Sequence, residues 1–442
     1  MSYVGIDFGT TNSAVAIAQA SGPSRLVPLT VGPQVFETFR SVLFFEKQED
    51  RLGTTLVHWA GPDAIEAYLD SEGEGRFVQS VKSYLASKDF TGTNILGKQF
   101  GIEPLVSLIL KDLKAKAETS AGPLPRTIVV GRPAHFVGES GEDAEAMALD
   151  RLREAFRLAG MPEIRFELEP VAAAYHYESG LERDELVLIA DFGGGTSDFC
   201  LLRVGPEARA RASAETRHGD GSRADDILGV GGVGIAGDSF DSRIVEHCVT
   251  PHLGRGTRYR SMDGQMLPMP VWPFEYMRRW HLLSFLNTTQ TRRMLAEILR
   301  TAEQPKQVQA LITVIEEGLG FHLHRAVEKA KVALSAQPET QFRFAMPGGS
   351  IETTIRRADF EEWVRPETEA ISACVDDLMA RTGVAFADVD RVFLTGGSSF
   401  IPVIRRLFSD RFGEGKLRTG GELTSVASGL ALAARAVAGA DS

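Results

Sequence analysis

Two glycine-rich segments carry the residue types that phosphate and magnesium chemistry requires. Residues 7–13 read DFGTTNS, and residues 191–198 read DFGGGTSD. In each segment an aspartate follows an apolar run and is itself followed by phenylalanine, glycine and threonine. The backbone N–H groups of such a turn form a concavity for anions, and glycine lets a ligand approach closely. Asp7 and Asp191 would face a hydrated cation rather than the anion.

Each segment on its own is also compatible with a plain hairpin turn. Because the same pattern occurs twice, the sequence favours one joint phosphate site over two independent turns. Two carboxylate-led turns suit a triphosphate whose oxygens are neutralised by a metal ion. The residues predicted to line this site are Gly9, Thr10, Thr11, Asn12, Gly193, Gly194, Gly195 and Thr196.

The elements that must position these turns follow from the apolar patterning. Strands are expected at residues 3–8 and 14–17 around the first turn, and at 186–190 and 199–204 around the second. A strand–turn–strand unit therefore occurs twice, which predicts two related lobes of an α/β protein. A helical period over residues 142–159 predicts a helix between them.

One other glycine pattern is interpreted as a loop. Gly229, Gly231 and Gly234 match a dinucleotide-binding fingerprint in form, but a strand before them and a helix after them are not evident. Residues 205–237 are rich in Gly, Ala, Arg and Asp, and part of this stretch is predicted to be a long loop. No spacing of Cys and His predicts a transition-metal site.

Composition restricts the class of protein. The chain has 442 residues, 43% of them hydrophobic, and a formal net charge of -11. Such a chain is expected to be globular, and its negative field disfavours nucleic acid and anionic membranes as partners. Its three cysteines do not form a disulfide framework. With no targeting segment and no membrane-spanning stretch recognised, a cytoplasmic location is expected.

Four further segments, in order along the chain, resemble motifs of the seventy-kilodalton heat-shock chaperones (the DnaK-like family). They are EPVAAA at residues 169–174, GDSFD at 237–241, EKAKVALS at 328–335 and TGGSSFIP at 395–402. With the two turns, they extend the resemblance from residue 5 to about residue 430. The length, and GRPAHF at 131–136, are most similar to the truncated YegD-type members, which lack the peptide-binding domain.

The resemblance implies an α/β fold of the actin-like ATPase superfamily, with two ribonuclease-H-like lobes and a nucleotide cleft between them. Lobe I would span residues 1–185 and lobe II residues 186–442, with an insertion at about 240–345. It also implies ATP or ADP with Mg²⁺ as cofactors and slow ATP hydrolysis. The protein would be a nucleotide-controlled switch or an auxiliary chaperone without a peptide-binding domain of its own.

The resemblance also assigns catalytic roles to individual residues. Asp7 and Asp191 would hold a hydrated magnesium ion, and Thr196 would contact phosphate. Glu169 would orient the attacking water or act as base. Lys82 matches the catalytic lysine of the family; without that match, it would be read as an ordinary solvated lysine. Phosphoryl transfer needs mainly positioning and charge stabilisation, which such a set supplies.

A second group of residues would bind adenosine. The residues are Gly237, Glu328, Lys331, Ser335, Gly396, Gly397, Ser398 and Phe400. The helix at 328–335 would carry its three members on one polar face, opposite an apolar face. In the family two arginines enclose the adenine, whereas Val332 and Phe400 stand at the corresponding positions. The loss of two cationic planes predicts weaker nucleotide binding than in full-length chaperones.

Some readings stay open at this point. Aromatic residues are concentrated between residues 272 and 285, and are either core or a docking surface for a protein partner. Filament-forming cytoskeletal ATPases, small-molecule kinases and catalytically silent nucleotide sensors are alternatives on the same fold. The sequence does not fix the oligomeric state.

Overall fold

The computed structural model describes residues 2–31, 34–50, 53–71, 75–125, 127–137, 141–215, 224–279, 282–283, 286–420 and 424–440. Contacts divide the chain into two compact units. The first unit comprises Met1–Ala67, Gln79–Gly237 and Thr368–Ser442, and the second comprises Tyr68–Val78 and Asp238–Glu367. The predicted boundary between lobes after residue 185 falls inside the first unit, and it stays a prediction.

The first sheet of the first unit has the order β13-β12-β1-β2-β3, and β6 also pairs with β2. Its strands are β1 (Tyr3–Phe8), β2 (Asn12–Ala18), β3 (Arg25–Leu26), β6 (Phe39–Arg40), β12 (Thr127–Arg132) and β13 (Glu163–Leu168). The hairpin β1–β2 is antiparallel, whereas β12 and β13 continue the sheet in parallel. This sheet therefore presents the first turn at the end of a buried hairpin. The turn is shorter than the predicted residues 9–13, because β2 already begins at Asn12.

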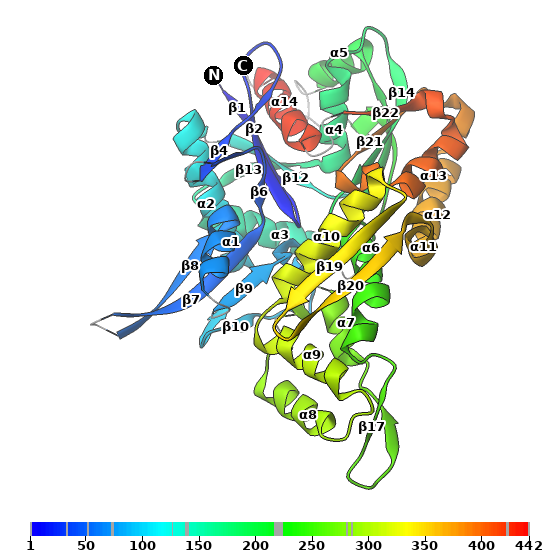
Figure 1. The fold of residues 1–442 in the computed structure, drawn as a ribbon. Coiled ribbons are helices and arrows are strands. Elements are labelled where there is room, and N and C mark those ends of the chain that lie inside the picture. The colour runs from blue at the N-terminus through cyan, green and yellow to red at the C-terminus, as the bar shows by residue number, and fades with distance from the viewer. Residues whose placement is uncertain are drawn as a thin grey trace. The chain divides into compact units, whose positions relative to one another are not determined.

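The second sheet repeats this plan with the order β16-β15-β14-β21-β22. Its strands are β14 (Glu185–Phe192), β15 (Ser197–Val204), β16 (Ile227–Val233), β21 (Arg391–Thr395) and β22 (Leu417–Thr419). Again an antiparallel hairpin, β14–β15, is extended on one side by parallel strands. The two predicted strand–turn–strand units are thus confirmed, each within a sheet of the same topology (Figure 1).

Helices α4 (Glu169–Glu178) and α14 (Ser425–Ala440) pack on each other, and α14 also lies against β1 and β2 (Figure 1). Small residues make this approach possible. A Cβ atom at Gly429 would lie 1.6 Å from the carbonyl oxygen of Ala172, and one at Gly5 would lie 2.3 Å from the backbone nitrogen of Ala431. Alanines of both helices and apolar residues of both sheets form one buried cluster around them.

The first unit contains further helices, 3₁₀ turns and strands, some of which form small separate sheets. The helices are α1 (Gly61–Asp70), α2 (Ile102–Ala121), α3 (Glu142–Leu158), α5 (Pro206–Glu215), α12 (Arg365–Thr382) and α13 (Pro402–Phe412), and the 3₁₀ turns include η1 (Val81–Tyr84) and η7 (Gly397–Phe400). The other strands are β4 (Leu29–Val31), β5 (Gln34–Phe36), β7 (Val42–Asp50), β8 (Gly53–Ala60), β9 (Arg76–Gln79), β10 (Thr93–Ile95) and β11 (Lys98–Phe100). Helices α1 and α12 and strand β9 each continue into the second unit.

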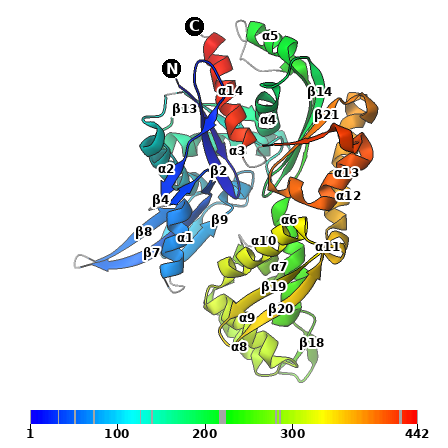
Figure 2. The ribbon, with the colours of Figure 1, turned by 45° about the horizontal axis from the view of Figure 1, so that its top comes forward.

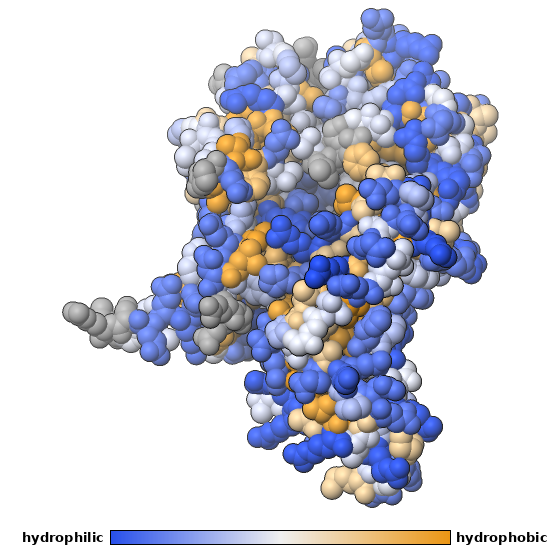
Figure 3. Space-filling model, viewed as in Figure 1, coloured by the Kyte–Doolittle hydropathy of each residue, from blue (hydrophilic) through white to orange (hydrophobic). Residues whose placement is uncertain are grey.

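The second unit is built around a hairpin of β19 (Glu339–Met346) and β20 (Gly349–Arg356), against which α10 (Gly320–Ala336) packs (Figure 2). Its other elements are α6 (Gly237–Ile244), α7 (Trp272–Arg278), α8 (Thr289–Leu299), α9 (Pro305–Glu316), α11 (Arg357–Trp363), β17 (Arg258–Arg260) and β18 (Met266–Pro268). Apolar residues of α10, including Val327 and Leu334, are buried. On the face drawn in Figure 3, hydrophobic residues of this unit are scattered among hydrophilic ones.

The prediction of a loop at Gly229–Gly234 is wrong for most of that segment. Residues 227–233 form β16, which pairs with β15 and extends the second sheet. The glycine at 229 is explained by packing, since a Cβ there would lie 2.6 Å from Cγ2 of Thr382 on α12. Part of the stretch at residues 205–237 is predicted to be a long loop; within it Pro206–Glu215 form α5, and residues 216–223 lie outside the described residues. None of the helices in the described part of the chain is long and apolar enough to cross a membrane.

Candidate nucleotide site

The first turn joins β1 to β2, and its backbone folds tightly on itself. A Cβ at Gly9 would lie 2.1 Å from the carbonyl oxygen of Asn12, so a side chain at this position would force the turn open. The carbonyl oxygen of Thr11 accepts a hydrogen bond from the backbone N–H of Ser41 (2.9 Å). By contrast, the Oγ1 atom of Thr11 is buried and has no hydrogen-bond partner among the described residues. A buried hydroxyl of this kind is available to donate a hydrogen bond to water or to a bound ligand.

The second turn joins β14 to β15 and is closed by a hydrogen bond from the N–H of Gly193 to the carbonyl oxygen of Thr196 (2.9 Å). The loop after β21 passes directly against the start of this turn. Gly396 has φ +80°, and a Cβ there would lie 2.1 Å from the carbonyl oxygen of Phe192. Glycine at 396 is therefore required both by its left-handed backbone and by the close approach.

The two turns lie close to each other within the first unit. A Cβ at Gly195 would lie 3.6 Å from Oγ1 of Thr10, in the first turn, and 3.9 Å from Oγ of Ser83. Ser83 is the residue after Lys82, so three separate segments come together at this point. The predicted joint site is thus compatible with the observed geometry, although its assignment to phosphate stays a prediction.

Lys82 and Glu169 form a buried ion pair beside the two turns. Nζ of Lys82, on η1, donates to Oε1 of Glu169, the first residue of α4, at 2.6 Å. Only 7% of the Lys82 side chain and 10% of the Glu169 side chain are exposed. The alternative of an ordinary solvated lysine is therefore wrong. Burial alone would lower the pKa of Lys82, but Glu169 and Asp7 outweigh it and the net shift is upward.

Three aspartates share this environment, and each holds its proton more strongly than usual. Burial, followed by the negative charge of Glu169, raises the pKa of Asp7 and of Asp198 to about 7. Burial also raises the pKa of Asp191 well above its ordinary range, with further contributions from Glu169, Asp198 and Asp7. Lys82 opposes all three shifts. The site therefore holds more buried negative charge than its lysine neutralises.

Sequence reasoning missed Asp198 as a site residue. Asp198 is 1% exposed, and its Oδ1 accepts a hydrogen bond from the N–H of Ala134 (2.8 Å). It stands directly opposite Asp191 in the β14–β15 register. Like charges directly opposite in a sheet destabilise it, so this pairing was itself a signal. Asp191 and Asp198 are equally far from the middle of the second turn, so their pairing could have been inferred from the sequence of the hairpin.

The donor set fits a hydrated magnesium ion. Among the described residues no three His, Cys, Asp or Glu side chains gather closely enough to cage a metal directly. Magnesium commonly retains several of its waters, so Asp7 and Asp191 would hold it through them. Burial first, and then repulsion, raise the pKa of these carboxyls, and a divalent cation would oppose both effects.

The predicted adenosine residues are distributed over both units. In the first unit, Gly396 precedes η7, which contains Gly397, the buried Ser398 and the half-exposed ring of Phe400. Gly237 begins α6 and donates its N–H to the carbonyl oxygen of Gly193 (3.4 Å). Gly237 is the last residue of this stretch of the first unit, so the contact lies within that unit.

In the second unit, Glu328, Lys331 and Ser335 are partly buried on one face of α10, as predicted. Nζ of Lys331 donates to Oδ2 of Asp241 on α6 (2.8 Å). Two of the resembling segments, 237–241 and 328–335, are therefore joined by an ion pair. Val332 on the same helix is 64% exposed. Their contact with adenosine stays a prediction.

The aromatic insertion divides between core and surface. Phe274 is buried, whereas Trp272 is partly exposed and makes an edge contact with Tyr276 at 5.5 Å between ring centroids. Trp280 and Phe285 lie outside the described residues. Two histidines of α10 differ in the same way: His324 is buried and its Nε2 lies 3.2 Å from the carbonyl oxygen of Met277, whereas His322 is exposed. A partner-binding role for this segment stays a prediction.

Comparison with known proteins decides the family. A family model described as Hsp70 protein matches residues 74–255 and 314–442, which together are more than half of the chain. The chain belongs to the Hsp70 family. The Hsp70 family carries the actin-like ATPase fold, in agreement with the two related sheets of the first unit.

Individual Hsp70 relatives match along nearly the whole chain. Chaperone protein DnaK of Thermotoga petrophila is 27% identical over 449 residues, covering 99% of this chain and 60% of that protein. DnaK of Thermotoga maritima gives the same values, and DnaK of Thermotoga neapolitana is 26% identical. This Hsp70-family chain therefore spans about 60% of the length of these relatives.

Proposed function

We propose that this protein binds Mg-ATP at the two turns, hydrolyses it slowly, and acts as a nucleotide-controlled switch or auxiliary chaperone. The observation that carries the proposal is the buried Lys82–Glu169 pair beside two turns that approach each other. A buried lysine surrounded by carboxyls with raised pKa values is typical of functional sites. Membership of the Hsp70 family, whose members in general bind ATP or ADP with magnesium, supports adenine nucleotide as the ligand.

Each residue of the site has a distinct role in this proposal. The N–H groups and hydroxyls of the two turns bind the phosphates, and Thr11 Oγ1 supplies a buried donor. The Lys82 ammonium stabilises charge on the transferred phosphoryl group. Glu169, whose Oε1 is held by Lys82, orients the attacking water or accepts its proton. When bound, magnesium would neutralise phosphate charge, with Asp7 and Asp191 holding its waters.

The switch would use the helices that connect the two sheets. Glu169 begins α4, and α4 packs on α14 through the contact of Gly429 with Ala172. Residues of both sheets join the same buried cluster. A change at the turns with nucleotide state would therefore reach α14 through packed helices. We propose that the two lobes that respond to the nucleotide state are residues 1–185 and 186–442.

Hydrogen exchange with nucleotide tests this function. Mg-ATP should slow amide exchange in residues 7–13 and 191–198, and Mg-ADP should leave a different pattern at α14. The β19–β20 hairpin of the second unit should exchange equally in both states and serves as the internal control. Slow release of phosphate from Mg-ATP should accompany these changes. Unchanged exchange at both turns with saturating Mg-ATP would contradict the proposal.

A further inference from the structure

The position of Lys82 depends on a short loop with little regular structure. Residues 80–90 leave β9, form the single 3₁₀ turn η1 and lead toward β10. Within this loop Leu85 donates its N–H to the carbonyl oxygen of Lys82 (3.2 Å), and Ser87 donates to that of Tyr84 (3.1 Å). Ser80 just before the turn has φ +53°, an unfavourable conformation for serine. Such a turn is weakly stabilised by its own hydrogen bonds.

Arg151 on α3 holds this loop from outside. Its Nη1 atom lies 3.3 Å from the carbonyl oxygen of Tyr84, 2.9 Å from that of Leu85 and 2.8 Å from that of Ser87. Its Nη2 atom donates to the carbonyl oxygen of Phe90 at 3.4 Å. One guanidinium therefore contacts four carbonyl groups within the seven residues 84–90.

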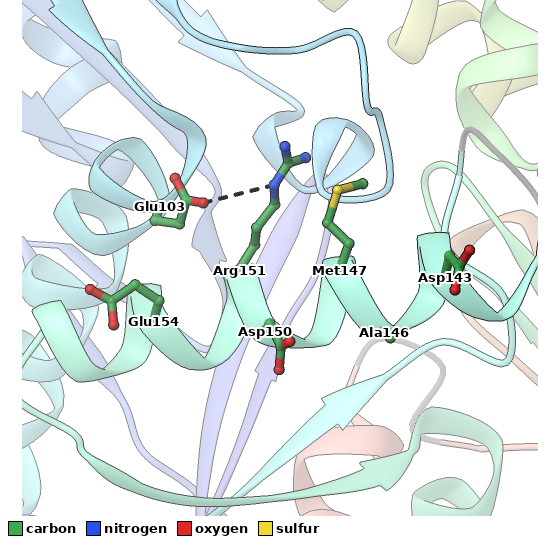
Figure 4. Close-up of a pocket in the computed structure, with 7 residues that line it drawn as sticks. All are labelled: Glu103, Asp143, Ala146, Met147, Asp150, Arg151 and Glu154. Atoms are coloured by element: carbon green, nitrogen blue, oxygen red, sulfur yellow. Dashed lines mark ion pairs between the residues drawn. The ribbon is translucent and has the colours of Figure 1, made fainter.

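The guanidinium is itself fixed on its other side. Nε of Arg151 lies 3.8 Å from Oε1 of Glu103 on α2 (Figure 4). Both residues line an open pocket with Met147 and further acidic side chains of α3 (Figure 4). The Arg151 side chain is only 17% exposed, so its bonds to the loop are largely shielded from water. The arrangement joins α2, α3 and the loop through one side chain.

We propose that Arg151 is a positioning residue for Lys82. The connection runs through the backbone of Leu85. Its N–H binds the carbonyl oxygen of Lys82, and its own carbonyl oxygen binds Arg151. Arg151 thereby ends η1 as a cationic cap and fixes the backbone that presents the Lys82 ammonium to Glu169. The catalytic consequence rests on the function proposed above.

The chemistry requires arginine in particular. A guanidinium offers five N–H donors in a fixed plane, which suits several carbonyl groups at once. A lysine would keep the charge but has a smaller, mobile donor group. Arg151→Lys should therefore fix the loop that carries Lys82 only in part, and Arg151→Ala should not fix it.

Arg153→Ala is the matched control. Arg153 is on the same helix, but it is 54% exposed, pairs with Asp150 at 2.8 Å and lies over the ring of Phe166. Its removal changes the charge of α3 by the same amount as Arg151→Ala and touches no part of the loop at 80–90. Far-UV circular dichroism should show that all three variants are folded.

The first test measures Lys82 itself and needs no nucleotide turnover. The rate at which an amine-acylating reagent modifies Lys82 is followed by mass spectrometry in the nucleotide-free protein. Loss of the hydrogen bonds from Arg151 to the loop should raise this rate roughly 10-fold or more in Arg151→Ala, because the loop would open locally. Arg151→Lys should be intermediate and Arg153→Ala unchanged. An unchanged rate in folded Arg151→Ala would overturn the proposal.

The second test asks whether Arg151 acts through Lys82 in hydrolysis. The single-turnover rate constant should fall about 10- to 100-fold in Arg151→Ala, the effect of a small misplacement of a catalytic group. In a Lys82→Ala background the same substitution should have no further effect, whereas equal effects in both backgrounds would overturn the proposal. If the wild type proves inactive, the proposed function fails, and the acylation rate alone decides whether Arg151 positions Lys82.

Discussion

Replacement of Lys82 by methionine should destabilise the protein strongly even in the absence of nucleotide. Lys82 as a whole is 6% exposed, and its Nζ lies 2.6 Å from Oε1 of Glu169. Methionine keeps much of the length and apolar volume of the side chain but removes its charge. The buried Glu169, Asp191 and Asp198 would then lack their cation. Removal of one partner of a buried pair costs about 3–5 kcal/mol.

The effect should also depend on pH, and its sign follows from the pKa shifts. Asp7 and Asp198 have pKa values near 7 in the folded protein, against a usual 3.8. Between these values the folded state binds more protons than the unfolded state, so rising pH lowers stability across this range. Lys82 opposes these shifts, so its loss should raise both pKa values further. The destabilisation by Lys82→Met should therefore be larger at pH 8 than at pH 5.5.

Urea unfolding in the presence of EDTA measures this effect. The unfolding free energies are compared with one value of m, the slope of free energy against urea concentration, for all variants. Lys114→Met is the control, because Lys114 pairs with Glu118 at 2.9 Å on α2 but is partly exposed. That surface pair should contribute about 0.3–0.5 kcal/mol and show little dependence on pH. If Lys82→Met were no more destabilising than Lys114→Met at pH 8, the buried-charge reasoning would be refuted.

Three further predictions concern packing, the base and the metal. Gly429→Ala should cost about 3 kcal/mol, since its Cβ would overlap the carbonyl oxygen of Ala172, whereas Gly415→Ala has open space and should change the unfolding free energy little. Phe400→Ala should weaken ATP binding in calorimetry by about 1–3 kcal/mol if its ring stacks on the base, and a nanomolar wild-type dissociation constant would contradict the expected weak site. Asp191→Asn should reduce the extra thermal stabilisation that Mg-ATP gives over ATP with EDTA; an equal gain in both proteins would argue against Asp191 as the magnesium-holding residue.

Much of the fold could be predicted because local patterns and tertiary structure agree. The apolar runs before Asp7 and Asp191 became β1 and β14, and glycine with threonine marked both turns. The strand containing Gly229 could not be predicted in this way. Its glycines lower strand propensity, and the strand exists because it pairs with β15 and lies against α12. That information is in the tertiary contacts rather than in the segment.

The candidate site shows the same division. The turns could be found from their residue types, whereas Lys82 has no distinctive local pattern and was recognised through family resemblance alone. Its burial against Glu169 comes from residues 87 positions apart in the chain. Asp198 could have been found from the hairpin register, since it faces Asp191. Arg151 could not, because its four carbonyl partners depend on how α3 packs beside the loop.

The most direct test of the account is single-turnover hydrolysis of Mg-ATP by the wild type, Lys82→Ala and Lys114→Ala. The account predicts slow hydrolysis by the wild type and by Lys114→Ala, and a large fall in the rate constant in Lys82→Ala while that variant still binds nucleotide. Wild-type hydrolysis that persists unchanged in folded Lys82→Ala would contradict the assignment of Lys82. No hydrolysis by the wild type would contradict the proposed ATPase and would favour a silent nucleotide sensor.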